Sequence, residues 1–408
     1  MPDRTEAEAA RALLSAGAVR ERAHEMLRLC EADRLGHWRF DASKLPAIAD
    51  FVLTVMRENY PDLAVPFHAR WRHFSAGGRD RWSRIAEGAR WPDAASQARA
   101  EIDLAIVSVL LDAGAGSAWR YREADGAVSA RSEGLAIASL DMFANGLFSG
   151  RAEDPLRADA GRLAEITETE LAAGFQVSAD NPLVGLAGRA MLMNALGRAC
   201  LAAPDAFALR DSARPGGLFD LLEAPHIEAD MILRAVLAHL GSIWPSRLAL
   251  GGVTLGDTWR HPAIRRDDPT DGLVPFHKLS QWLTYSLIEP LLRAGCIVTN
   301  IDGLTGLPEY RNGGLFVDGG ALVARDMADM ARAHAVDSPF IVEWRALTVA
   351  LLDRLADMIR ERLGRSADDL PLACVLEGGT WAAGRRMAAA RRAGGGPPLD
   401  IVSDGTVF

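Results

Sequence analysis

Residues 339–364 read PFIVEWRALTVALLDRLADMIRERLG, and this stretch decides the fold class of the chain. Apolar side chains recur in it every three or four residues, which places them on one face of a helix. Alanine, leucine, arginine and glutamate, all good helix formers, fill most other positions. The same pattern marks six more segments: 6–31, 45–59, 94–113, 154–172, 218–241 and 273–294. We therefore expect a mainly α protein.

Strand signals are few and short, so any sheet should be small. The best candidates are 117–123, 294–301 and 314–318. No linker rich in Pro, Gly and Ser divides the middle of the chain, and long loops that carry Trp, His and Arg join the helices. Such loops are typical of a binding or catalytic site. We expect one domain over 1–393, with a helical N-terminal lobe over 1–115 as the alternative, and a loosely held Gly/Pro-containing tail at 394–408.

Composition excludes several classes of protein. Of the 408 residues, 49% are hydrophobic and 24% charged, as in ordinary globular proteins. A net charge of −9 argues against nucleic acid as the main partner. The four cysteines show no zinc-site or disulfide spacing, which fits the cytoplasm. No signal peptide and no membrane-spanning run is present, so we expect no membrane partner.

Common catalytic templates are also absent from the sequence. It has no GxGxxG after a strand, no GxxxxGK[ST], no HExxH and no GxSxG. A Rossmann enzyme, a P-loop NTPase, a zincin and an α/β-hydrolase are therefore disfavoured.

The stretch DGLVPFHKLSQ at 271–281 is the first candidate site. Asp271 stands at a glycine turn, and we expect a helix to begin near Leu273. The structural alternative to a functional role is that Asp271 is only the N-cap of this helix. His277 and Gln281 should share a helix face within one turn of that end, where the helix dipole favours an anion or a polar ligand.

A second acid, Asp257, lies in LGDTWRH at 255–261, beside Trp259, Arg260 and His261. The structural alternative is a surface loop held by an Arg–Asp pair. If the two carboxylates of Asp257 and Asp271 meet, they suit acid/base or oxocarbenium chemistry.

Four other segments mix charged and aromatic residues. The loop at 66–74, PFHARWRHF, suggests either Trp–Arg packing or a base-stacking or phosphate-holding edge, and its two histidines are poorly spaced for a metal. Arg311 and Asn312 precede two glycines, which indicates an anion contact or a plain turn. Glu343 and Arg345 begin an apolar helix, where a buried structural pair is the alternative. The segment 376–385 adds a Glu, a Trp and an Arg.

Seven motifs together resemble the uracil-catabolism family of fungi and bacteria, over roughly residues 20–390. They are HARWRHF, SVLLDAGAG, RSEGLAIAS, FQVSADNPLVG, DGLVPFHKLSQWLTYSLIEPL, GLPEYRNGGLFVD and VEWRALTVALLD. The resemblance implies a role in the pathway that converts uracil to a nucleotide, opens its ring and releases urea.

A fainter similarity is to the queuosine-5′-phosphate N-glycosylase family. The positions that carry it are Asp257, Asp271, Val274-Pro275, Gln281, Glu343, Arg345 and Trp381. This sequence departs from that pattern because Phe276, His277 and Lys278 lie between the Val-Pro step and Gln281.

Together the two resemblances imply hydrolysis of the N-glycosidic bond in ribosylurea or its 5′-phosphate, through an oxocarbenium-like transition state and without a metal or other cofactor. Asp271 would face the sugar while Asp257 activates water or binds the ribose hydroxyls, or the two would exchange roles. His277 or Glu343 would hold or protonate the ureido nitrogen, and Gln281 would supply an amide. The implied phosphate contacts are Lys278, Arg260 and Arg311, and the other implied substrate contacts are Trp259, His261, Glu309, Asn312, Arg345 and Trp381.

Two alternatives stay open at this level. One is an amidohydrolase that cuts the ring-opened ureido chain, and the other is a noncatalytic ligand sensor or scaffold of the pathway. The sequence does not determine the number of chains in the protein.

Overall fold

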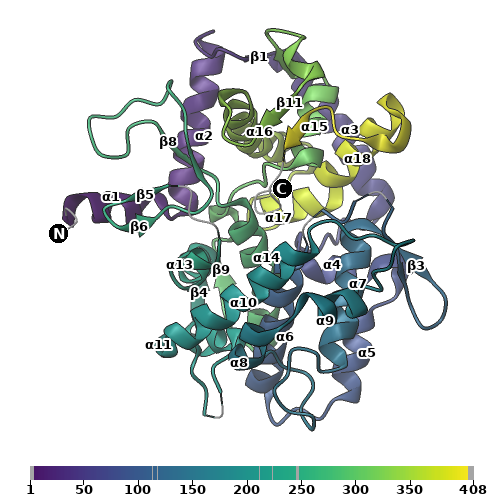
Figure 1. Cartoon of the computed structure of the whole chain (residues 1–408). Coiled ribbons are helices and arrows are strands. Elements are labelled where there is room, and N and C mark those ends of the chain that lie inside the picture. The colour runs from purple at the N-terminus through teal and green to yellow at the C-terminus, as the bar shows by residue number, and fades with distance from the viewer. Residues whose placement is uncertain are drawn as a thin grey trace. The chain divides into compact units, whose positions relative to one another are not determined.

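The computed structural model describes residues 4–112, 114–116, 118–210, 212–222, 224–244 and 248–402, and it confirms the mainly α fold (Figure 1). Contacts divide these residues into two compact units. Unit 1 comprises 1–68, 246–282 and 300–408, and unit 2 comprises 69–245 and 283–299, within the described ranges. The single domain expected over 1–393, like the alternative lobe over 1–115, stays a prediction.

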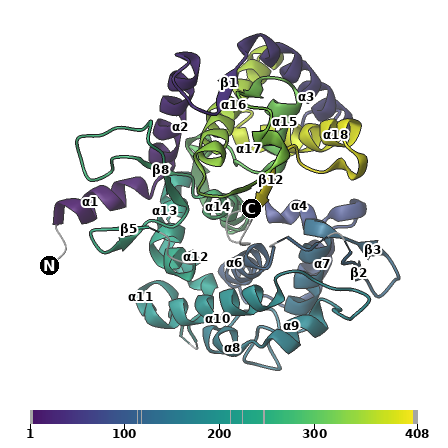
Figure 2. The ribbon, with the colours of Figure 1, turned by 45° about the horizontal axis from the view of Figure 1, so that its top comes forward.

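Unit 1 is built around α16 (Pro339–Leu363), whose residues from Phe340 to Leu352 are all buried. Helix α2 (Ala16–Glu31) packs beside it, as Figure 1 and Figure 2 both show. On another side α15 (Tyr310–Asp318) approaches so closely that a Cβ on Gly313 would lie 2.2 Å from the Trp344 ring. The remaining helices of unit 1 are α1 (Arg4–Leu13), α3 (Leu45–Asn59), α17 (Leu372–Val375), a π-helix (Leu376–Thr380), α18 (Trp381–Arg391) and the start of α14 (Lys278–Arg293).

Paired strands in unit 1 are two or three residues long. The pairs are β1 (Trp38–Phe40) with β10 (Leu322–Ala324), β5 (Ala249–Leu250) with β6 (Val253–Thr254), β7 (Thr258–Arg260) with β8 (Leu273–Pro275), all antiparallel, and the parallel pair β11 (Ala333–Ala335) with β12 (Asp400–Val402). The last pair corrects the expected loosely held tail, because residues 400–402 are hydrogen-bonded into it. Residues 403–408 of that tail lie outside the described residues.

Unit 2 has its core on α6 (Ala94–Leu110), which is buried continuously from Ala100 onward. Helices α8 (Ala160–Glu165) and α10 (Leu186–Ala202) pack closely, since a Cβ on Gly197 would lie 2.4 Å from the Ala164 nitrogen. The other helices of unit 2 are α4 (Arg70–Phe74), α5 (Arg81–Gly88), α7 (Arg131–Ala144), α9 (Glu168–Gly174), α11 (Pro204–Phe207), α12 (Leu218–Leu222), α13 (Ala229–Leu240) and the rest of α14. Its strand pairs are β2 (Tyr121–Arg122) with β3 (Val128–Ser129) and β4 (His226–Glu228) with β9 (Ile297–Thr299).

Short 3₁₀ turns complete both units. They are η1 (Ala42–Lys44), η5 (Ile301–Gly303), η6 (Asp329–Ala331) and η8 (Ala393–Gly395) in unit 1, and η2 (Ala76–Gly78), η3 (Pro215–Gly217) and η4 (Gly241–Ile243) in unit 2.

The best helix predictions hold nearly to the residue. Residues 45–59 form α3, and α16 ends one residue before the predicted 364, where Gly364 takes a left-handed C-cap with φ 63°. The helix predicted over 94–113 ends at Leu110, and Ala113 lies outside the described residues. No helix among the described residues is both long and apolar enough to cross a membrane.

Local capping breaks two of the predicted helices. The Ser15 side chain accepts a hydrogen bond from the Ala18 nitrogen and starts α2 anew within 6–31. Thr167 and Glu170 form a capping box that starts α9 within 154–172.

Short strands interrupt the other two predicted helices, and one predicted strand is wrong. Strand β4 divides 218–241, and β8 occupies the first residues of 273–294. Of the predicted strands, 117–123 contains β2, with Ser117 outside the described residues, and 294–301 contains β9. The segment 314–318 is helical instead, because Glu309 caps α15 ahead of it.

Candidate functional site

The hairpin of β7 and β8 carries both predicted carboxylates but keeps them apart. Its register pairs Thr258 with Pro275 and Arg260 with Leu273, so Asp257 lies at one end and Asp271 at the other. At about 3.3 Å per residue, the two are separated by roughly 15 Å along the hairpin. The expected meeting of Asp257 and Asp271 is therefore wrong.

Asp271 is not the N-cap of a helix, because residues 273–275 form β8 and the helix begins at Lys278. The Asp271 side chain is 39% exposed and accepts a hydrogen bond from the Arg266 nitrogen at 2.7 Å. Arg260 is exposed beside it and donates to the Asp271 carbonyl. Both residues therefore stabilise a surface loop.

Asp257 holds the start of α14 against α16. Arg345 donates to both of its carboxylate oxygens at 2.7 Å, Trp259 Nε1 donates to Oδ1 at 2.7 Å, and the Lys278 nitrogen donates to Oδ2 at 3.0 Å. Burial alone would raise the pKa of Asp257, but Arg345 and the other donors hold it below its ordinary 3.8. Four donors saturate this carboxylate. Asp257 and Arg345 therefore form a buried structural pair, which was the alternative given for Arg345.

His277 immediately precedes α14 in a left-handed conformation, with φ 50°. It is 1% exposed, its Nε2 lies 2.9 Å from the Leu13 carbonyl, and burial lowers its pKa. The imidazole is therefore neutral, with its proton on Nε2. Nδ1 has no hydrogen-bond partner among the described residues. We name Asp257, His277, Lys278 and Arg345 the α14 cluster.

Glu343 is 1% exposed and anchors the segment before β1. Its carboxylate accepts hydrogen bonds from the backbone nitrogens of Gly36, His37 and Trp38 at 3.1–3.2 Å. His261 Nε2 lies 3.2 Å from Glu343 Oε1 and is itself 3% exposed. The sequence analysis placed Glu343 and His261 in one site, and the structure does bring them together. The Glu343 carboxylate, however, already accepts hydrogen bonds from three backbone nitrogens.

Gln281 lies one turn after His277, as predicted, and fixes the loop that follows η5. Its Nε2 donates to the Phe276 carbonyl and to Thr305 Oγ1, and its Oε1 accepts from the Thr305 nitrogen at 2.8 Å. The residue is fully buried. Every polar atom of its amide is thus bonded to the chain itself.

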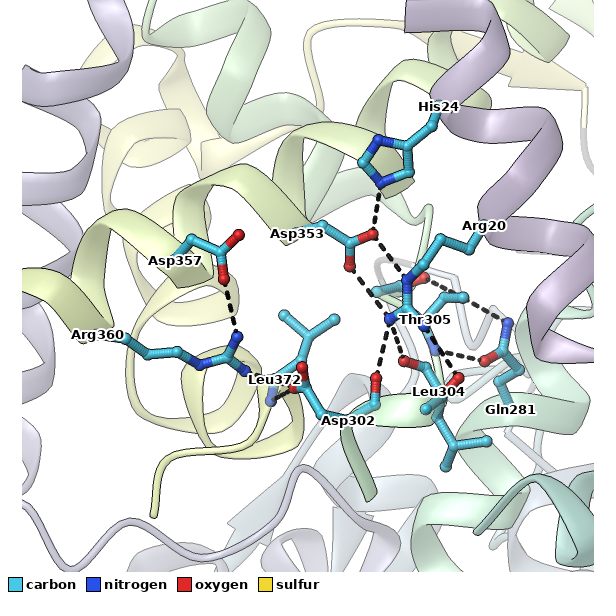
Figure 3. A network of polar contacts seen from close by, with 12 residues as sticks. Arg20, His24, Gln281, Asp302, Leu304, Thr305, Asp353, Asp357, Arg360 and Leu372 are labelled. Carbon is cyan, nitrogen blue, oxygen red and sulfur yellow. Dashed lines mark hydrogen bonds and ion pairs between the residues drawn. The ribbon is translucent and has the colours of Figure 1, made fainter. Parts of the chain in front are cut away.

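A polar network continues from Thr305 to α2 and α16 (Figure 3). Arg20 donates to Asp353 at 2.9 Å and to the carbonyl oxygens of Asp302, Gly303 and Leu304, while His24 contacts Asp353 at 2.7 Å. Burial would raise the pKa of Asp353, but His24 and Arg20 lower it overall.

The Asp302 carboxylate ties the same loop to the start of α17. It accepts a hydrogen bond from the Leu372 nitrogen at 2.7 Å and pairs with Arg360 (Figure 3). The π-helix follows α17 directly.

The other predicted contact residues lie around α15. Glu309 caps the helix by accepting from the nitrogens of Arg311 and Asn312. Arg311 donates to the Gly395 carbonyl, and buried Asn312 bonds the Leu307 carbonyl and the Thr380 hydroxyl. Asn312 therefore links α15 to the end of the π-helix.

Sequence reasoning missed one pair of side chains. Glu377, in the π-helix, lies with its Oε2 2.8 Å from His68 Nδ1, and Tyr60 donates to its Oε1 at 3.4 Å. The Glu377 side chain is 17% exposed and that of His68 is 9% exposed. We name Tyr60, His68 and Glu377 the π-helix cluster. Its local signals in the sequence were the segments 66–74 and 376–385, which mix charged and aromatic residues. The structure adds the π-helix, a conformation that is rare and frequent at functional sites.

The glycines after Glu377 explain why the π-helix fits where it does. A Cβ on Gly379 would lie 2.5 Å from a Val52 methyl group, and one on Gly378 would lie 2.9 Å from a Val65 methyl group. The backbone therefore lies directly against α3 and the segment after it, which also brings Tyr60 to Glu377. One turn after Glu377 stands Trp381, with the Arg385 guanidinium 5.5 Å from its ring centre.

Among the described residues, no three His, Cys, Asp or Glu side chains are grouped so that they could hold a metal ion. The expectation that the chain needs no metal stays a prediction.

Comparison with known proteins supplies the family. A family model described as "Protein of unknown function (DUF1688)" matches residues 12–408. "Protein urg3" of Schizosaccharomyces pombe is 40% identical over 412 aligned positions, which cover 97% of this chain and 98% of that protein. "Uracil catabolism protein 4" of Lachancea kluyveri is 37% identical over 411 positions, covering 91% and 92%. With a match over nearly its whole length, the chain belongs to the DUF1688 family and is a homologue of these two proteins.

Proposed function

We propose that this chain acts in uracil catabolism and hydrolyses the N-glycosidic bond of ribosylurea or its 5′-phosphate. The pathway is supported by the name of its relative "Uracil catabolism protein 4" and by the length of that match. The reaction is supported by the chemistry available in unit 1, where the π-helix cluster joins a histidine to a carboxylate.

Cleavage of a C1′–N bond has two demands. The urea nitrogen must receive a proton, because a urea anion is a poor leaving group, and the positive charge that develops on C1′ and O4′ must be stabilised until water adds. The balanced reaction consumes one water and yields urea and the free sugar or its 5′-phosphate.

The contact between His68 and Glu377 is the observation that carries the proposal. Glu377 accepts a hydrogen bond from His68 Nδ1 and stabilises the imidazolium form of the ring, and in that form Nε2 carries the proton that passes to the leaving nitrogen. Among the described residues, His68 Nε2 makes no hydrogen bond. Glu377 keeps accepting capacity for the attacking water, because its second oxygen has only the long 3.4 Å contact with Tyr60.

Asp257 suits these roles less well than Glu377. Its charge is already balanced by Arg345 and its oxygens accept four hydrogen bonds. We therefore propose that the α14 cluster supports the site while the π-helix cluster acts on the substrate.

The test is direct. Purified protein incubated with ribosylurea and with its 5′-phosphate should release urea, and Glu377→Gln and His68→Asn should each lower kcat by about 100- to 10,000-fold. The matched control is Glu361→Gln, an exposed carboxylate on α16, which should keep full activity.

Two outcomes would reject the proposal. Ammonia as the first product would indicate an amidohydrolase, and full activity of the folded Glu377→Gln variant would remove the π-helix cluster from the chemistry. Tight binding of uracil or a nucleotide without turnover of either compound would indicate a sensor.

A further inference from the structure

A hollow of about 290 Å³ lies within unit 2, and its lining includes none of the residues of the proposed reaction. Its volume is close to the lower end for small-molecule sites. Two helices and the end of a third form its wall, which consists of Trp82, Ser83, Ala86 and Glu87 from α5, Gln97 and Glu101 from α6, and Arg293 from α14.

One residue that lines this hollow carries a buried carboxylate whose bonding is complete. Glu101 is fully buried; its Oε1 accepts from Trp82 Nε1 at 2.9 Å and from Gln97 Nε2 at 3.0 Å, and its Oε2 accepts from Arg293 at 2.9 Å. Arg293 also contacts Glu289 at 3.3 Å and lies 4.7 Å from the centre of the Trp71 ring. Neither Glu101 nor Arg293 needs a ligand.

The wall offers a ligand two kinds of acceptor, the Gln97 amide oxygen and the Glu87 carboxylate. Gln97 uses its amide nitrogen on Glu101, so its Oε1 remains to accept. The Ser83 hydroxyl donates to Asp80. Within the described ranges, the exposed carboxylate of Glu87 makes no hydrogen bond or ion pair. A ligand with hydrogen-bond donors would satisfy these acceptor atoms.

The net charge of the wall also favours a ligand with hydrogen-bond donors. Glu101 and Arg293 balance each other, so Glu87 leaves the wall with one net negative charge. Trp82 and Ala86 add an apolar surface next to it. Donors, positive charge and a short apolar portion define the complementary ligand.

We propose that this hollow binds a small organic cation, namely a primary ammonium or guanidinium group on a short aliphatic chain. The cationic group donates to Glu87 and to Gln97 Oε1, and its aliphatic portion lies on Trp82 and Ala86. Because a hydrogen bond to a charged group is stronger than one between neutral groups, loss of the Glu87 charge lowers the affinity by roughly tenfold or more.

The probe is n-butylammonium chloride, added to the full-length protein and followed by saturation-transfer NMR and calorimetric titration. We expect saturable binding that weakens at least about tenfold in Glu87→Gln. Glu87 is exposed, so this variant should fold. Glu153→Gln, an exposed carboxylate elsewhere in unit 2, is the matched control and should bind like the unchanged protein.

Three results would overturn the proposal. Binding of n-butanol as tight as that of n-butylammonium would make the hollow a plain apolar site. Equal binding of urea would show that the charge of the ligand does not matter. Unchanged affinity in Glu87→Gln would remove Glu87 from the binding site. Turnover of ribosylurea is measured separately, so failure of the proposed reaction does not affect this result.

Discussion

The α14 cluster and the π-helix cluster each place a carboxylate next to a histidine, but they use it differently. In the first, four donors saturate Asp257 and the neighbouring His277 is buried. In the second, Glu377 has one short and one long contact and its side chain is 17% exposed, while His68 is buried. The comparison teaches that the number of donors around an acid, rather than the acid itself, separates a structural tie from a candidate for chemistry.

The largest expected effect is on stability, from Asp257→Asn. Removing this charge leaves the fully buried Arg345 without its counter-ion, which costs about 3–5 kcal/mol. Urea denaturation should show this loss. The matched change in the other cluster, Glu377→Gln, should cost less than about 1 kcal/mol, since it removes no buried ion pair with an arginine. Equal losses in the two variants would erase the distinction between the clusters.

A second, smaller effect concerns pH. The pKa of Asp257 is lowered in the folded protein, so its stabilising contribution is complete above its ordinary value of 3.8 and is lost as pH falls through the lower folded value. The difference in unfolding free energy between the unchanged protein and Asp257→Asn should therefore be constant from pH 7 to about pH 4 and shrink below it. Denaturant titrations at several pH values measure this difference. A gap that stays constant to pH 2.5 would contradict a titration of Asp257 in that range.

The smallest expected effect comes from Asp271→Asn. Asparagine keeps an oxygen that can accept from the Arg266 nitrogen, so stability should change by less than about 0.5 kcal/mol, and urea release should persist. The sequence-based hypothesis, in which Asp271 faces the sugar, predicts loss of that activity. A urea assay on this one variant therefore separates the two assignments.

The helix ends that were predicted well depend on residues next to them in the chain. Helix α3 has a proline near its start, and α16 has Ser338 before it and Gly364 after it. Periodicity did not reveal the strand at 273–275, since a run of three apolar residues fits a helix and a strand equally. Only the partner strand β7, more than ten residues earlier, decides between the two.

The candidate site was less predictable, because its contacts join distant parts of the chain. His68 and Glu377 are 309 positions apart, and Asp257 and Arg345 are 88 apart. Each of these four residues stood out locally by its neighbours. Nothing local indicated which acid would meet which base.

By itself, the sequence determined that this protein is mainly α and where its longest helices lie, because helical hydrogen bonds and caps join residues only a few positions apart. The tertiary structure decided that Asp257 pairs with Arg345, that Asp271 stays on a surface loop and that Glu377 receives His68. These outcomes depend on how helices pack and on strand register, and both bring together side chains whose separation along the chain carries no information about their distance in space.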